Sequence, residues 1–193
     1  MGPVKLIAPR RLNDPRGWFA ETWNAHSFAR LGVEANFVQD NLSRSGPRGV
    51  LRGLHFQAPP HAQAKLVRCA RGRIFDVAVD IRRGSPSFGA WTGAELSEEN
   101  GRMLFIPAGF AHGFLTLQDD CEVAYKASDF YAAQSEGGLI WSDPDLAIAW
   151  PLAGGAPLVS DKDSRLPGLA GFQSPFVYDG EPLTPVGDEP LTP

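Results

Sequence analysis

The chain has 193 residues, of which 43% are hydrophobic and 21% are charged, and its formal net charge is −4 at pH 7. This length predicts a single domain that can bury a sizeable core. The mild acidity argues against a general nucleic-acid-binding protein, which needs concentrated lysine and arginine, and no apolar run approaches the ~18 residues of a membrane span.

The two cysteines, Cys69 and Cys121, are too few for a disulfide framework. We therefore expect two free thiols in a reducing cytoplasm. The first residues include Lys5 and Arg10 without an apolar segment, so no secretory signal peptide is predicted.

The N-terminal region predicts a strand near residues 4–7, a turn at 13–17 and a second strand at 18–23. Glu21 lies beside two aromatic residues in that second strand, where it would be either a salt-bridge partner or a ligand contact. Asn24 is expected to cap a short helix that runs to Arg30 and is ended by Gly32.

Residues 33–130 carry successive strand signals, separated by glycine, proline or asparagine about every 8–12 residues. With 21 glycines, 17 prolines and little helical periodicity, this pattern predicts an all-β antiparallel jelly roll with a few short helices. We expect residues 1–178 to form one domain with an N-terminal arm. Residues 179–193 are acidic and proline-rich, and we expect them to be a flexible tail.

Residues 39–80 contain ionisable side chains within strands that otherwise look buried. Burying such groups is costly unless they are paired, so a cluster of them suggests a lined pocket. The residues concerned are Arg52, His55, Lys65, Arg68, Asp76 and Asp80.

Strict alternation along a strand would place Arg52 and His55 on opposite faces. Both can reach one pocket only if Gly53 marks a bulge or a twist. Lys65 begins the next strand; it either points to solvent or faces inward, where its ammonium could stabilise an oxyanion.

Other candidates follow along the chain. His112 lies among glycines and phenylalanines that suggest a tight approach to an apolar cavity, and Asp76 is a plausible partner for a buried histidine. The phenol of Tyr131 could act as a general acid. Either Asp161 or Asp163 could fold back onto His55 and raise its basicity.

A metal site is the competing use of histidine in a small β-barrel. The four histidines, His26, His55, His61 and His112, include no His-x-His pair, and no recognisable ligand spacing is present, so we predict no metal site. No P-loop, GxGxxG or GxSxG motif occurs, which argues against nucleotide hydrolysis, dinucleotide binding and α/β-hydrolase chemistry.

Six strings, in this order between Asp14 and Asp163, together resemble the dTDP-4-dehydrorhamnose 3,5-epimerase family. They are FVQDNLSRS, GVLRGLHFQ, AKLVRC, FDVAVDIRRGSPSFG, IPAGFAHGF and WSDPDLAIAWP. The resemblance implies a cupin-type jelly roll that needs neither metal nor cofactor. It also implies a homodimer whose subunits exchange N-terminal segments.

Carried over by position, the resemblance makes His55 the base, Tyr131 the acid on the opposite sugar face and Asp163 the partner of His55. Lys65 would lie near the C4 oxygen. The further residues implied are His112 with Asp76 as its partner, the substrate contacts Gln39, Asn41, Arg52 and Lys162, and the nucleotide-binding arm residues Arg16, Phe19 and Glu21. An aromatic side chain such as Phe19 or Trp141 could stack on thymine. Ser142 departs from the family pattern, where an acidic or amide residue is common.

The function expected from this resemblance is epimerisation of dTDP-4-dehydro-6-deoxy-D-glucose at C3 and C5 to dTDP-4-dehydro-L-rhamnose. A base would remove the proton beside the C4 ketone, and an acid would return one on the opposite face. The alternatives are an epimerase acting at C3 or C5 alone, a non-catalytic sugar-nucleotide-binding cupin and a metal-dependent cupin. We expect no nucleic-acid or membrane partner.

Overall fold

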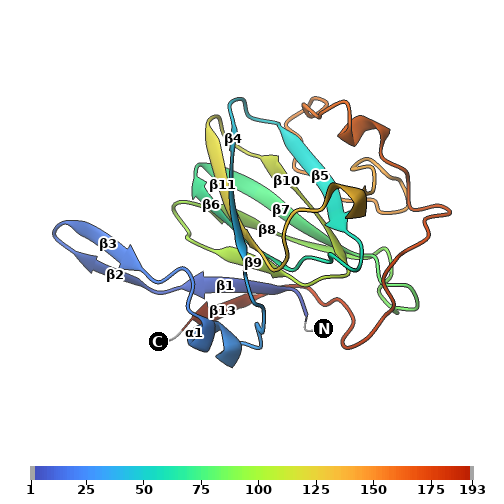
Figure 1. Ribbon diagram of the computed structural model, residues 1–193. Coiled ribbons are helices and arrows are strands. Elements are labelled where there is room, and N and C mark those ends of the chain that lie inside the picture. Colours follow the sequence, from blue (N-terminus) through green and yellow to red (C-terminus); the bar gives the residue numbers. More distant parts are fainter. Residues whose placement is uncertain (1–2, 192–193) are drawn as a thin grey trace.

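Two β-sheets face each other across the interior of the molecule (Figure 1). The computed structural model describes residues 3–191. Within them, one sheet has six strands in the order β13-β1-β9-β6-β11-β4 and the other has five in the order β12-β5-β10-β7-β8. Apart from the parallel pair β1–β13, the neighbouring strands within each sheet are antiparallel. The predicted jelly roll is confirmed.

The bounds of the elements follow the glycine and proline punctuation of the sequence. The six-stranded sheet contains β1 (Lys5–Pro9), β4 (Gln39–Ser45), β6 (Lys65–Arg71), β9 (Met103–Ile106), β11 (Cys121–Ala127) and β13 (Asp188–Leu191). The five-stranded sheet contains β5 (Leu51–Gln57), β7 (Arg73–Asp80), β8 (Trp91–Ser97), β10 (Phe110–Thr116) and β12 (Glu136–Gly138). The remaining elements are the hairpin of β2 (Arg11–Asp14) and β3 (Gly17–Ala20), the helix α1 (Ala25–Arg30), and two 3-10 turns, η1 (Ala133–Ser135) and η2 (Asp163–Arg165).

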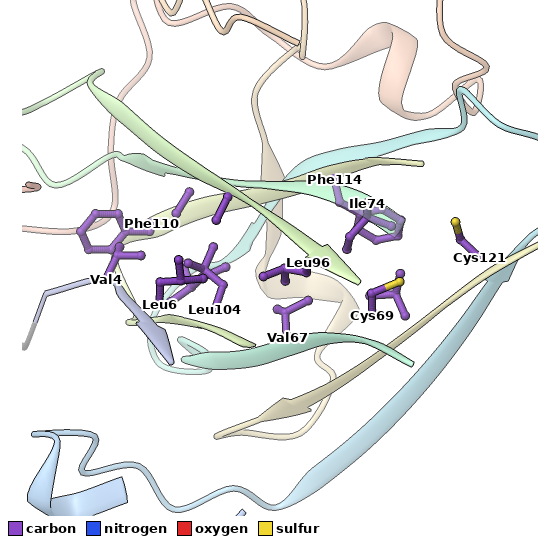
Figure 2. Close-up of a cluster of buried hydrophobic side chains, with 14 residues drawn as sticks. Val4, Leu6, Val67, Cys69, Ile74, Leu96, Leu104, Phe110, Phe114 and Cys121 are labelled. Carbon is purple, nitrogen blue, oxygen red and sulfur yellow. The ribbon is translucent and has the colours of Figure 1, made fainter. Parts of the chain in front are cut away.

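The core between the sheets is made by every second residue of each strand, as the pleat requires. On β7, Ile74 and Ala78 belong to this inner cluster, whereas Val77 and Val79 belong to a cluster on the outer face of the five-stranded sheet. Figure 2 shows inward side chains from several strands meeting in one apolar cluster. Asp76 therefore points into the barrel, because it alternates with the outward residues of β7.

The outer faces of the two sheets are covered differently. Loops of residues 139–176 pack on the five-stranded sheet through Leu139, Trp150 and Phe176. The six-stranded sheet is covered at β1, β9 and β6 by α1 and the chain that follows it, through Phe28 and Val33.

The helix after the arm begins and ends as predicted. Asn24 accepts hydrogen bonds from the backbone N–H groups of His26 and Ser27 at 3.0 and 3.4 Å, and Gly32 has a φ of +74° just past the C-cap. The preceding strand is shorter than predicted and ends at Ala20. Glu21 instead turns toward the helix start, where its carboxylate accepts from Asn24 Nδ2 at 3.0 Å and Ser27 Oγ at 3.2 Å.

The C-terminal segment corrects the expectation of a flexible tail over 179–193. Residues 188–191 form β13, which pairs in parallel with β1, and Leu183 and Val186 pack against the inner core. Local composition missed this because the partner of β13 is the first strand of the chain. Residues 192–193 lie outside the described residues.

None of the helices formed by residues 3–191 has the length and apolar character needed to cross a membrane.

Candidate active site

A cavity of about 540 Å³ opens between the two sheets and the loop of residues 158–163. Strands of both sheets and the loop of residues 158–163 supply its polar lining: Ser43, Arg52, His55, Lys65, His112, Tyr125, Ser160, Lys162 and Asp163. Six of these residues are predicted site residues, all except Ser43, Tyr125 and Ser160. Of the ionisable residues predicted to share a pocket, Arg68 borders a hollow on the outer face of the six-stranded sheet, and Asp80 pairs with Arg82 elsewhere.

His55 and Asp163 form a hydrogen-bonded pair at the cavity wall. His55 Nε2 lies 2.8 Å from Asp163 Oδ1, while Asp163 Oδ2 accepts from the Gly53 N–H at 3.1 Å. An ionised carboxylate only accepts hydrogen bonds, so Nε2 carries the proton and Nδ1 keeps a lone pair. Burial lowers the pKa of His55, and Asp163 offsets part of that effect. The ring is therefore neutral near pH 7, as a base must be.

The irregularity at Gly53 resolves the alternation problem between Arg52 and His55. The register between β5 and β10 shifts between His112 and Phe114, and Gly53 has a φ of +127°. A Cβ at this position would lie 2.5 Å from the Cα of Gly113. Only glycine fits here, and the shift allows Arg52 and His55 to line one cavity.

A second histidine–carboxylate pair lies deeper in the barrel. His112 Nε2 is 2.8 Å from Asp76 Oδ1, and Asp76 is fully buried. Among residues 3–191, Asp76 Oδ2 has no hydrogen-bond partner. Burial lowers the pKa of Lys65 to about 8, although the charges of Asp76 and Glu136 oppose that shift. Asp76, His112 and Lys65 thus form an electrostatically coupled group.

Tyr125 is the cavity residue that the sequence interpretation missed. It lies on β11, in the sheet opposite the one that carries His55, and lines the same cavity. Burial raises the pKa of its phenol, opposed by the charge of Arg52, so the hydroxyl is protonated at neutral pH. Alternation with the inward residues Cys121 and Val123 is the signal that could have found it.

Tyr131, the predicted acid, does not line this cavity. Its side chain is 59% exposed, and its backbone N–H donates to Gln39 Oε1 at 3.0 Å. It is nevertheless close enough to Lys162 to help raise the pKa of that ammonium, although a hydrogen bond to Glu136 is the larger cause. Tyr131 thus lies outside the cavity, on the Lys162 side.

The edge strand β4 brings two further predicted residues beside Tyr125. Asn41 is the register partner of Tyr125, and its Oδ1 accepts a hydrogen bond from Gln39 Nε2 at 3.0 Å. Across the cavity, Lys162 Nζ lies 2.5 Å from Glu136 Oε2. Glu136 was not anticipated; its pairing with Lys162 spans about 26 residues of loop and is not visible in local sequence.

The remaining predicted residues lie away from the cavity of their own chain. Arg16, at the tip of the β2–β3 hairpin, pairs with Asp14 at 2.6 Å, and Phe19 is 67% exposed. The hairpin projects from the barrel (Figure 1), and Glu21 follows it. Trp141 borders a separate hollow of about 360 Å³ beside Trp150, whose Nε1–H donates to the Trp141 carbonyl at 3.0 Å.

Groups of three or more His, Cys, Asp or Glu side chains with metal-binding geometry do not occur within residues 3–191.

Comparison with known proteins gives consistent matches along most of the chain. A family model described as dTDP-4-dehydrorhamnose 3,5-epimerase matches residues 2–171. A curated protein of that name from Sinorhizobium fredii is 49% identical over 175 residues, which are 91% of this chain and 89% of the relative.

Two solved structures have the same fold. A dTDP-6-deoxy-D-glucose-3,5-epimerase from Legionella pneumophila, in complex with dTDP-4-keto-L-rhamnose, is 45% identical with a TM-score of 0.86 and covers 92% of this chain and 94% of that chain. A 3′-monoepimerase from Streptomyces bikiniensis, in complex with dTDP, is 37% identical with a TM-score of 0.81 and covers 87% of this chain and 84% of that chain. That protein carries a histidine-to-asparagine and a tyrosine-to-phenylalanine substitution 70 residues apart.

Proposed function

The chain belongs to the dTDP-4-dehydrorhamnose 3,5-epimerase family, and we propose that its His55 cavity moves protons at the two carbons beside a sugar ketone. The substrate is dTDP-4-dehydro-6-deoxy-D-glucose and the product dTDP-4-dehydro-L-rhamnose. C3 and C5 both flank the C4 ketone, so one set of side chains can serve both inversions. The observation that carries this proposal is that His55 and Tyr125 enter one cavity from opposing sheets.

His55 is the base in this mechanism. A hydrogen beside a ketone is acidic because the resulting anion delocalises onto the carbonyl oxygen. Neutral His55 takes that proton on the ring nitrogen that faces away from Asp163. Asp163 holds the tautomer and stabilises the imidazolium that forms, while the enclosed cavity keeps water away.

Tyr125 is the acid that returns a proton on the opposite face of the sugar, in place of Tyr131. Its phenol is protonated at neutral pH and lines the cavity, whereas Tyr131 does not. The two positions substituted in the S. bikiniensis monoepimerase are 70 residues apart, and the same separation joins His55 to Tyr125 in this chain. Inversion requires donor and base on opposite faces of the ring, which opposing sheets provide.

Lys65 stabilises the enolate. Lys65 lines the cavity, and the charge of Asp76 acts on its ammonium. A fixed positive charge stabilises an anion more strongly there than in water, because the surroundings are less polarisable. His112, held by Asp76, contacts the sugar beside it.

The remaining polar groups bind the nucleotide and the sugar. Arg52 is a natural bidentate partner for the diphosphate. Lys162 contacts the substrate at the cavity wall, and Gln39 and Asn41 contact it from the edge strand β4. Phe19 stacks on thymine, a role for which Trp141 is poorly placed because it borders a different hollow.

The arm residues Arg16, Phe19 and Glu21 act in the cavity of a second copy, within a homodimer that exchanges its N-terminal segments. The projecting hairpin, with Trp18 56% and Phe19 67% exposed, supports this assignment. The outer face of β4 and β11 also offers a hollow of about 460 Å³ beside Leu42, which is 66% exposed. Sedimentation equilibrium tests the dimer directly.

We also propose that the enzyme works in a reducing cytoplasm, which two free thiols support. Both cysteines are free and buried, and burial raises the pKa of the Cys69 thiol to about 12, so it stays protonated.

The test is solvent deuterium exchange into the 4-keto sugar nucleotide, followed by NMR. We expect wild-type protein to exchange at C3 and C5, His55→Ala to abolish both, and His61→Ala to leave both unchanged. His61 is a matched control because it pairs with Asp129 at 3.2 Å, outside the cavity. Exchange at one carbon alone would indicate a mono-epimerase, and dTDP binding without exchange would indicate a binding protein.

A further inference from the structure

The segment of residues 179–191, here called the C-terminal strap, lies beyond the family match, which ends at residue 171. It is tied along one side of the barrel by hydrogen bonds. The Glu181 carbonyl accepts from Arg82 at 3.0 Å, and the Leu183 N–H donates to Ser87 Oγ at 2.8 Å. The Val186 N–H donates to Thr92 Oγ1 at 3.3 Å. The strap is therefore bound over much of its length.

The end of the strap is fixed on β1, the strand that leads into the arm. β13 pairs with β1 from Leu6 to Pro9, and two ion pairs flank the pairing. Lys5 Nζ lies 3.1 Å from Glu189 Oε1, and Arg102 Nη2 lies 2.5 Å from Asp188 Oδ2. Figure 1 shows β13 beside β1, close to where the chain enters the β2–β3 hairpin.

Leu191 lies at the root of the hairpin. It is 6% exposed and belongs to the apolar cluster under α1. It also lines a hollow of about 210 Å³ with Leu12, Phe19 and Glu21, and two of these three are proposed nucleotide-binding residues. The hairpin is also attached through Arg11, which donates to the backbone carbonyls of Glu98 and Glu99. Its tip carries Arg16, which pairs with Asp14 of the same hairpin.

We propose that the C-terminal strap is a positioning element for the arm and thereby raises the affinity for the nucleotide part of the substrate; this rests on the proposed role of the arm. A two-stranded hairpin is marginally stable by itself. Fixing its root at β1 and at Leu191 removes conformational freedom that binding would otherwise have to remove, and such preorganisation strengthens binding. No residue of the strap lines the cavity that holds His55 and Tyr125, so we expect the proton transfers to be unaffected.

The experiment compares Leu191→Asp, which places a charge at the root, with Leu191→Met, which keeps an apolar side chain there. Asp188→Asn is a second control, because its ion pair with Arg102 is exposed. We expect Leu191→Asp to raise KM for the dTDP-4-keto sugar about fivefold or more with kcat within about twofold. We expect the two controls to match wild type. If Leu191→Asp does not fold, Glu189→Lys, which repels Lys5, replaces it.

Backbone amide hydrogen exchange over residues 11–20 supplies a readout that does not need turnover. We expect faster exchange there in Leu191→Asp or Glu189→Lys. Unchanged exchange would overturn the inference, and so would faster exchange with unchanged KM. A fall in kcat alone would mean that the strap only stabilises the fold. A wild-type protein without turnover would instead contradict the proposed function, and the exchange data would still decide whether the strap orders the arm.

Discussion

Asp76 and Asp80 lie on the same strand, four residues apart and on the same inward face, yet the protein uses them differently. Both are fully buried. Asp80 pairs with Arg82, also fully buried, and accepts further hydrogen bonds from Ser85 and Ser87 at 2.7 Å each. Asp76 has one bonded oxygen, to His112, and one without a partner among residues 3–191. Asp80 is paired with an arginine away from the cavity, whereas Asp76 is paired with a histidine that lines the cavity.

The contrast follows from the groups that surround each of the two carboxylates. Burial by itself would raise the pKa of Asp80, but the hydrogen bonds from Arg82 and the two serines outweigh it and lower the pKa. This folded-state stabilisation is present above the unfolded pKa of about 3.9 and is lost as pH falls through the lower folded pKa. Asp76 instead lies beside Lys65 and His112, which both line the cavity. Asp80, at the end of β7, therefore stabilises the fold, whereas Asp76, in the middle of the strand, supports the cavity residues.

The largest expected effect at the cavity comes from its phenol. Tyr125→Phe removes the proton donor without changing the packing, so we expect turnover to fall about 100- to 10,000-fold. Some deuterium exchange should survive, because His55 remains. Tyr131→Phe is the matched control and should change turnover less than about tenfold. The reverse ranking of the two variants would return the acid role to Tyr131.

Substitution of Asp80 should lower the stability of the protein and leave its kinetics unchanged. Asp80→Asn leaves the buried guanidinium of Arg82 without its counter-charge, and breaking such a pair costs about 3–5 kcal/mol of unfolding free energy. Urea denaturation measures this loss. We expect KM and kcat of the folded fraction to stay near wild type, since Asp80 does not line the cavity. A kinetic defect without lost stability would show that Asp80, like Asp76, supports the reaction and not only the fold.

Asp163→Asn separates a positioning carboxylate from the base that it holds. The amide keeps the shape but cannot stabilise an imidazolium, and it can hold the wrong tautomer of His55. We expect kcat to fall about 100-fold. The acid limb of the pH profile should move lower, because Asp163 raises the pKa of His55 against the effect of burial. An unmoved limb would mean that His55 does not titrate in the rate-limiting step.

The sequence was sufficient for features that depend on local pattern. The alternation of β7, the cap at Asn24 and the condition on Gly53 all follow from the backbone geometry of a few neighbouring residues, and the structure confirms them. The pairing of Asp163 with His55 was one of two open choices. Chain spacing alone could not decide between Asp161 and Asp163, because the loop that carries both is irregular.

What the sequence missed depends on distant contacts. Tyr125 and Tyr131 are both phenols near the end of the strand region. Alternation puts Tyr125 on the same face as Cys121 and Val123, and the packing of β11 within the barrel shows that this face is the inner one. The strap looked flexible by composition, but its partner strand is almost the whole chain away. In both cases the outcome depends on strands that are distant in the sequence.

The smallest expected effect is a decline of activity at high pH that is set by Lys65, the lysine beside Asp76. Burial lowers the pKa of its ammonium to about 8. Because the protonated form stabilises the enolate, that contribution is present below this pKa and is lost as pH rises through it. We therefore expect kcat/KM to decline above pH 8 and Lys65→Arg, whose charge persists, to lose the decline even if its maximum is lower. The same decline in Lys65→Arg would assign the titration to another group.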